Sequence, residues 1–169
     1  MKLKMSHIPL NVHRNKSLTA VAQATSNEDR SILWREWLDT FYLACDQTRL
    51  AMLEEEPPFT DTFWDALFAA GVAWLAHKMH HPAPLWAKHV SRRLKFPYWR
   101  RSDPTSLTAI CDRARAPAEF YSRNLYIGPE IMLRARTPEA WLPRPLQWEI
   151  ELGKEILAYY SKKHCQTNS

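Results

Sequence analysis

Glycine is scarce in this sequence, with only three residues among 169, and this limits the folds and loops that can form. Tight β-hairpin turns and glycine-rich phosphate loops both need residues that adopt positive φ at low steric cost. A P-loop or a dinucleotide-binding fingerprint is therefore not expected. Twelve prolines punctuate the chain instead, several at positions suited to the first turn of a helix. This balance predicts an all-α fold, a single compact domain of about six or seven uneven helices.

Cysteine is sparse and unpaired, and long apolar runs are missing. Cys45, Cys111 and Cys165 lie far apart without a Cys-x-x-Cys spacing, which disfavours a disulfide framework and a zinc site. The longest apolar run covers eleven residues, 66–76, about half of what a membrane span requires. The basic N-terminus lacks the apolar run of a secretory signal. We therefore expect a soluble, cytoplasmic protein with reduced thiols and no membrane contact.

Acidic residues are absent between Asp65 and Asp103, and this gap is the strongest pattern in the chain. The preceding residues, 26–65, have the opposite balance, with ten Asp and Glu against three Arg. Charge of one sign attracts partners of the other, so the segregation predicts a protein that binds something. The seven cations in the gap are Lys78, Lys88, Arg92, Arg93, Lys95, Arg100 and Arg101.

The chain divides into a basic arm, a helical domain and a short tail. Residues 1–25 carry four cations and no acid, and form either a flexible arm or a segment that a partner orders. Residues 26–163 are the predicted helical domain and residues 164–169 the tail. Within the domain, apolar periodicity and helix-start signals predict helices over 26–54, 60–80, 85–94, from 103, around 119–123, from 128 and over 145–163, with one strand-like run at 125–127.

The second predicted helix is the candidate core of the domain. Its apolar residues lie on nearly all faces, which is typical of a helix buried at the centre of a protein. Trp64 belongs to this helix, and we expect it to lie in the core. Gly71, placed among alanines, would let another helix approach closely.

No motif for catalysis is recognisable, so we predict no catalytic residue, no metal and no cofactor. A nucleophile elbow and a His-Glu-x-x-His zinc motif are both absent from the sequence. His77, His80 and His81 are the densest group of potential metal ligands. Two interpretations stay open: the histidines sit favourably at a helix C-terminus, or they form the centre of a small metal-dependent hydrolase or nuclease.

The basic segment 88–101 is the best functional candidate because cations alternate with aromatic residues there. Cations contact phosphates and aromatic rings stack on exposed bases, so nucleic acid is one partner that fits. An acidic protein is another, and a plain solvated surface is the third interpretation. The proposed contact residues are Lys88, Arg92, Arg93, Lys95, Tyr98, Trp99, Arg100 and Arg101, with Phe96 inside the same loop.

Three consecutive acids, Glu54, Glu55 and Glu56, end the first predicted helix and precede two prolines. Carboxylates at a helix C-terminus oppose the macrodipole, which costs roughly 0.3–1 kcal/mol. A basic partner, or the basic middle segment of this chain, covering them would explain that cost, and we therefore include them as an acidic contact face. A solvated acidic turn is the alternative.

Several short segments between residues 50 and 135 form a recognisable pattern: LEEEPP at 53–58, FWDALFAA at 63–70, PLW at 84–86, Leu94, FPYW at 96–99, PAEFYSRN at 117–124, Ile127-Gly128 and LRA at 133–135. On these segments, residues 50–135 resemble a family of small, mostly uncharacterised helical bacterial proteins found in toxin–antitoxin or phage-defence type operons. The resemblance implies a binding or regulatory protein rather than an enzyme, acting on a partner such as a nucleotidyltransferase-like toxin. Residues 1–25 are too short to hold the helix-turn-helix segment that some members carry.

Together these patterns predict a non-enzymatic, antitoxin-like binding protein that masks a partner protein. A nucleic-acid-binding protein that uses segment 88–101 is the alternative. Within the segment PAEFYSRN at 117–124, Arg123 is expected to pair with Glu119 one helical turn back, and Asn124 to end that helix in a left-handed conformation.

Overall fold

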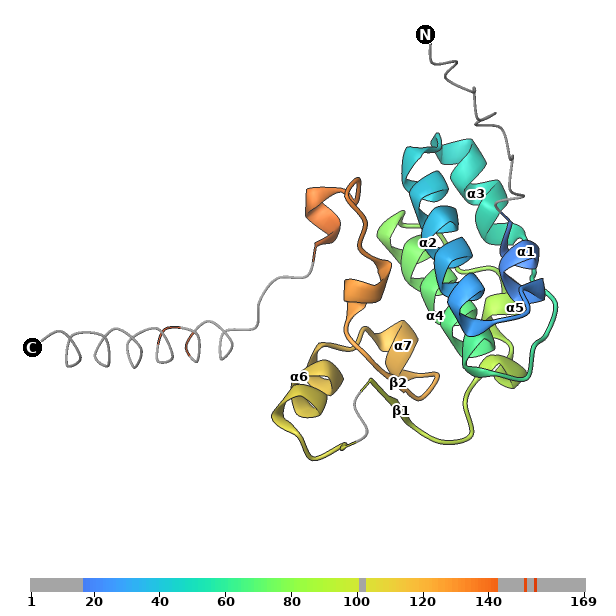
Figure 1. Cartoon of the computed structure of the whole chain (residues 1–169). Coiled ribbons are helices and arrows are strands. Elements are labelled where there is room, and N and C mark those ends of the chain that lie inside the picture. The colour runs from blue at the N-terminus through green and yellow to red at the C-terminus, as the bar shows by residue number, and fades with distance from the viewer. Residues whose placement is uncertain (1–16, 101–102, 143–150, 152–153, 155–169) are drawn as a thin grey trace, which may run out of the picture.

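The computed structural model describes residues 17–100 and 103–142, together with Glu151 and Lys154, and these are mostly helical (Figure 1). The predicted all-α fold is confirmed, with a small two-stranded sheet added to it. No helix in the described ranges has the length and apolar character needed to cross a membrane. The α-helices are α1 (Leu18–Gln23), α2 (Asn27–Leu43), α3 (Asp46–Glu54), α4 (Phe63–Lys78), α5 (Leu85–Lys88), α6 (Leu107–Arg115) and α7 (Ala118–Tyr121). Three short 3₁₀ turns cover Val90–Arg92, Pro129–Met132 and Glu139–Trp141, and the strands are β1 (Tyr98–Trp99) and β2 (Leu125–Tyr126).

The helical domain begins earlier than the sequence predicted. Ser17 caps α1 by accepting a hydrogen bond from the Ala20 amide, and the apolar side chains of Leu18 and Val21 are buried. Helix α1 packs against α2, so residues 17–25 are part of the domain and not of a basic arm. A six-residue helix carries too little periodicity to be recognised before its tertiary contacts are known. Residues 1–16 and the predicted tail lie outside the described residues.

The first predicted helix is two helices, α2 and α3, separated at Ala44 and Cys45. Ser26 caps α2 as expected, accepting a hydrogen bond from the Asp29 amide at 3.0 Å. The chain turns at Ala44 without proline or glycine, so the sequence contained no signal that predicts the break between the two helices. Arg49 on α3 closes the turn, because its Nε and Nη2 donate to the last carbonyls of α2 at 3.0 and 2.9 Å. Unpaired carbonyls at a helix end need such donors.

Helix α4 forms the centre of the domain, as predicted (Figure 1). Every residue from 64 to 76 is buried, and α4 packs against α3, α5 and α7. The helix is capped by Thr62, not by Thr60 or Asp61, and Asp65 completes a capping box. Gly71 does allow the predicted close approach, since a Cβ there would lie 3.1 Å from the Trp34 ring of α2.

Aromatic rings run from the core to the surface in a continuous chain. Trp34 and Trp37 stack with ring centroids 5.1 Å apart. Trp34 also contacts the ring of Phe68, which in turn contacts the ring of Trp64. Phe63 then links Trp64 to Tyr98 on β1, with the Phe63 and Tyr98 centroids 4.4 Å apart. This chain of rings fixes the aromatic loop against the N-terminus of α4.

The predicted aromatic loop contains β1, which pairs in parallel with β2 and aligns Tyr98 with Leu125. Asn124 adopts the predicted left-handed conformation, with φ 60°, and its side chain donates to the Leu94 carbonyl at 2.7 Å. Strand β1 was not predicted, because a strand of two residues has no measurable alternation of apolar and polar side chains. Helix α6 is capped by Ser106 rather than Asp103. The predicted last helix, 145–163, falls outside the described residues apart from Glu151 and Lys154.

Candidate partner-binding groove

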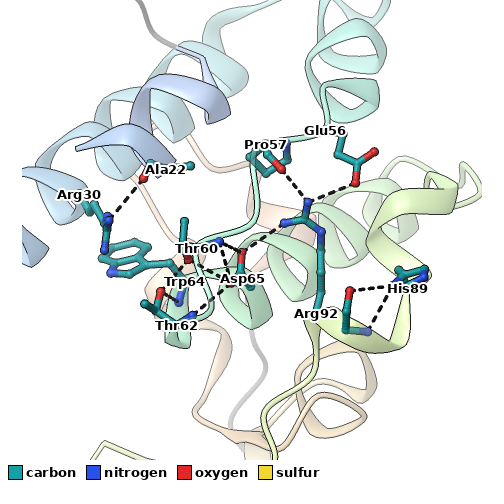
Figure 2. Close-up of polar contacts among 11 residues, drawn as sticks. Ala22, Arg30, Glu56, Pro57, Thr60, Thr62, Trp64, Asp65, His89 and Arg92 are labelled. Carbon is teal, nitrogen blue, oxygen red and sulfur yellow. Dashed lines mark hydrogen bonds and ion pairs between the residues drawn. The ribbon is translucent and has the colours of Figure 1, made fainter. Parts of the chain in front are cut away.

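Arg92 is buried, which corrects its assignment as a surface contact. Its side chain is only 3% exposed, and its guanidinium donates to the Pro57 carbonyl at 2.6 Å (Figure 2). Ion pairs join it to Asp65 at 3.3 Å and to Glu56 at 3.2 Å. The ring of Trp86 lies beneath it, with its centroid 5.0 Å from the guanidinium carbon. Arg92 therefore joins three segments of the fold and is not available to a partner.

Asp65, the carboxylate that faces Arg92, is also buried, and both of its oxygens accept hydrogen bonds. The main-chain amides of Thr60 and Thr62 donate to it, as does the Thr60 hydroxyl (Figure 2). A buried ion pair is tolerated when such additional hydrogen bonds satisfy its remaining sites. The network fixes the chain between α3 and α4 against the turn at Val90–Arg92.

Two of the three acids in the predicted acidic face also have structural partners. Glu55 Oε1 accepts a hydrogen bond from the Thr19 amide at 2.9 Å, in the first turn of α1. Glu56 contacts Arg92 while its side chain stays 61% exposed. Glu54 is exposed at the end of α3. Contacts within the chain thus account for Glu55 and Glu56, the latter through the basic middle segment, so a basic partner is not needed to explain these two.

An open groove of about 660 Å³ lies beside the buried pair, and we call it the Phe96 groove. Three large apolar side chains on its walls face solvent: Phe96 is 80% exposed, Val90 77% and Phe59 51%. The cations Arg93 and Lys95 line the same groove, and both are exposed. Arg92 and Asp65 lie at its base, where they hold its two sides together.

The remaining predicted contact residues do not share one surface. Tyr98 packs on Phe63 at the edge of the groove and is 38% exposed. Trp99 makes an edge contact with the Tyr126 ring, with the ring centroids 4.6 Å apart, so part of the Trp99 ring is covered by the neighbouring strand. Arg100 is exposed and lines a different cleft, while Lys88 is exposed on α5 outside the groove. Arg101 lies outside the described residues.

The Arg93 side chain has one neutral partner, since its Nη2 donates to Asn124 Oδ1 at 3.2 Å. Within the described part of the chain, no ion pair engages Lys88, Arg93, Lys95 or Arg100. Asp61 is the exposed acid among the groove-lining residues. The groove therefore combines uncommitted positive charge with exposed apolar surface.

The three histidines do not converge on one point. His77 Nδ1 lies 2.6 Å from Glu119 Oε1 on α7, and His81 Nδ1 lies 3.1 Å from the Pro82 carbonyl. His80 is exposed, with φ 55° at the end of α4. Across residues 17–100 and 103–142, no three side chains of His, Cys, Asp or Glu come together to hold a metal ion.

Arg123 has a structural role, in a form that differs in detail from the expected side-chain pair. Its Nη1 donates to the main-chain carbonyl of Glu119 at 2.8 Å, and its Nη2 donates to the carbonyl of Ala87. Burial lowers the pKa of Arg123, and the nearby charge of Glu119 opposes this effect. Arg123 thereby links α7 to the end of α5.

Comparisons with known proteins gave no relative: no family model, no curated protein and no solved structure matches the chain. The groove must therefore be interpreted from its own residues. Phe96 is the residue that sequence reasoning left out of its proposed contacts, although it named the loop. No signal in the sequence separated it from Leu94, Tyr98 and Trp99, which are large apolar residues of the same segment.

Proposed function

We propose that this protein is a non-enzymatic binding protein, regulatory and antitoxin-like, that masks a partner protein with the Phe96 groove. The observation that carries this proposal is the exposure of Phe96 and Val90 beside Arg93 and Lys95. Monomeric proteins rarely leave large apolar groups grouped on a surface unless the surface binds something. Aromatic anchors surrounded by polar groups are typical of the energetic centres of protein interfaces.

The charge of the groove indicates the kind of partner. Arg93 and Lys95 have no acidic neighbour within ion-pair distance in the described residues, so their charge is open to a partner. An apolar protrusion flanked by Asp or Glu would fill the groove and complement these cations. Charge complementarity of this kind guides association and orientation, while the buried apolar contact supplies affinity.

A salt-resolved co-purification tests the proposal. The tagged protein is isolated from its cells of origin as the wild type, as Phe96→Ala and as the control Leu43→Ala. Leu43 is 61% exposed on α2 and does not line the groove, so it controls for general loss of apolar surface. The wild type and Leu43→Ala should retain the same partner at moderate salt, because buried apolar contacts are not screened. Loss of the partner only in Phe96→Ala supports the groove, whereas equal capture by all three proteins contradicts it.

The family resemblance adds a specific expectation about the partner, a nucleotidyltransferase-like toxin encoded beside this protein. Co-expression with the neighbouring gene tests this. Growth restored by the wild type but not by Phe96→Ala would support masking of a toxic partner. A neighbouring gene that leaves growth unchanged when expressed alone would remove the antitoxin-like role.

Binding to nucleic acid is the second candidate, favoured by the exposed ring of Phe96 between Arg93 and Lys95. If each cation neutralises one phosphate, replacing both with Ala reduces the salt slope of single-strand binding by about 1.4, at roughly 0.7 per contact. Arg92, being buried, contributes nothing to that slope. An unchanged slope in the double variant rules out the groove as a phosphate track.

A further inference from the structure

A second cleft, of about 470 Å³, shares the Phe63–Tyr98 ring pair with the Phe96 groove. It is bounded by α2, the N-terminus of α4, β1 and the segment that follows β2. Its volume falls within the usual range of small-molecule sites, about 300–1,000 Å³. We call it the Arg35–Arg100 cleft, after the two cations that line it.

The walls of this cleft are largely aromatic and aliphatic. Phe63, Trp64 and Tyr98 contribute rings, and Ile127 and Ile131 contribute aliphatic surface. Tyr98 is partly exposed and Phe63 half-buried, so ring surface is accessible from the cleft. Accessible aromatic faces accept a planar ring by stacking, with little dependence on its identity.

Four ionic residues line the cleft, and only two of them are already paired. Arg134 forms a bidentate pair with Asp39, at 2.8 and 2.7 Å, and Glu130 is paired with Arg115. No hydrogen bond or ion pair joins the side chains of the other two residues, Arg35 and Arg100, to another described residue, and both are exposed. The cleft therefore offers two free guanidinium groups, which bind phosphate through paired, directional hydrogen bonds.

We propose that the Arg35–Arg100 cleft binds a small anionic aromatic ligand of the nucleoside monophosphate class. The planar base stacks against the rings at the Phe63–Tyr98 side, and the phosphate is held by Arg35 and Arg100. Side-chain guanidinium groups take the place of the glycine-rich loop that this chain lacks. The cations of this site are distinct from those of the Phe96 groove, since neither Arg35 nor Arg100 lines that groove, whereas Phe63 and Tyr98 line both.

Isothermal titration with nucleoside monophosphates tests this proposal. The probes are the adenosine, guanosine, cytidine and uridine 5′-monophosphates, with adenosine and inorganic phosphate as the two halves of the ligand. At least one monophosphate should bind saturably, and adenosine and phosphate should each bind at least tenfold more weakly than adenosine monophosphate or not at all. Absence of saturable binding for all four nucleotides overturns the proposal, as does phosphate binding as tightly as the nucleotides.

Two variants locate the site. Arg35→Gln/Arg100→Gln removes both free cations and should weaken nucleotide binding at least tenfold. Arg136→Gln removes an exposed arginine outside the cleft and should change it less than twofold. Both variants replace exposed residues, and their circular dichroism and melting temperature should match those of the wild type. Nucleotide binding that is unaffected in the double variant would place the ligand elsewhere and contradict the assignment.

Discussion

Replacing Arg92 with Met distinguishes a buried structural cation from a surface contact. Met keeps the apolar stem that packs near Trp86, so the substitution removes mainly the guanidinium. Breaking a buried ion pair by removing one partner costs about 3–5 kcal/mol, because the other charge stays buried. Asp65 keeps its hydrogen bonds from Thr60 and Thr62, and Glu56 is mostly exposed, so the lower end, about 3 kcal/mol, is expected.

The measurement is urea denaturation followed by tryptophan fluorescence, with Arg93→Met as the control. Arg93 is the adjacent cation and is exposed. Its side chain donates only to Asn124 Oδ1 among the described residues, so its replacement should cost less than about 1 kcal/mol. Arg92→Met should shift the unfolding midpoint strongly at an unchanged slope. Equal and small losses in the two variants would refute the reasoning, because Arg92 would then behave as an ordinary surface residue.

Three further predictions concern the core and its edges. Trp64→Ala should cost about 3–5 kcal/mol in urea denaturation, because the side chain is 6% exposed on the central helix, and a loss below about 1 kcal/mol would contradict its place in the core. Burial raises the pKa of Tyr42 to about 12, against about 10 in an unfolded chain. The folded state then holds its proton more tightly, so stability should decrease as pH rises from about 10 to 12, and Tyr42→Phe should remove that part of the decrease. Asn124→Ala should be less stable than Asn124→Gly by about 1 kcal/mol in thermal denaturation, since φ is 60° there, and equal stability would argue against the left-handed backbone.

Features that depend on local sequence were predictable from the chain. Ser26 caps α2, Asn124 adopts the left-handed conformation, and α4 is the central helix because its apolar residues cover every face. Each of these follows from neighbouring residues alone. The break between α2 and α3 was not predictable, since Ala44 and Cys45 carry no turn signal and the stabilising contact comes from Arg49.

Features that depend on distant residues were not predictable, and the basic segment shows why. Arg92 and Arg93 are indistinguishable in a charge pattern, yet one is buried and the other exposed. The difference arises from Trp86, Pro57 and Asp65, which the fold brings around Arg92. Burial also separates Trp99, which packs on β2, from Phe96, which faces solvent. One run of cations and rings thus contributes both to a buried structural network and to the exposed groove that we propose binds a partner.

The most direct test of the proposed binding function is the affinity of the captured partner for Phe96→Ala, measured by titration of purified components beside Leu43→Ala. An aromatic anchor at the centre of an interface contributes about 2 kcal/mol or more, which corresponds to about a 30-fold loss of affinity. We predict a loss of at least that size for Phe96→Ala and less than a twofold change for Leu43→Ala. Affinities that agree within twofold for both variants would contradict the Phe96 groove as the partner-binding surface.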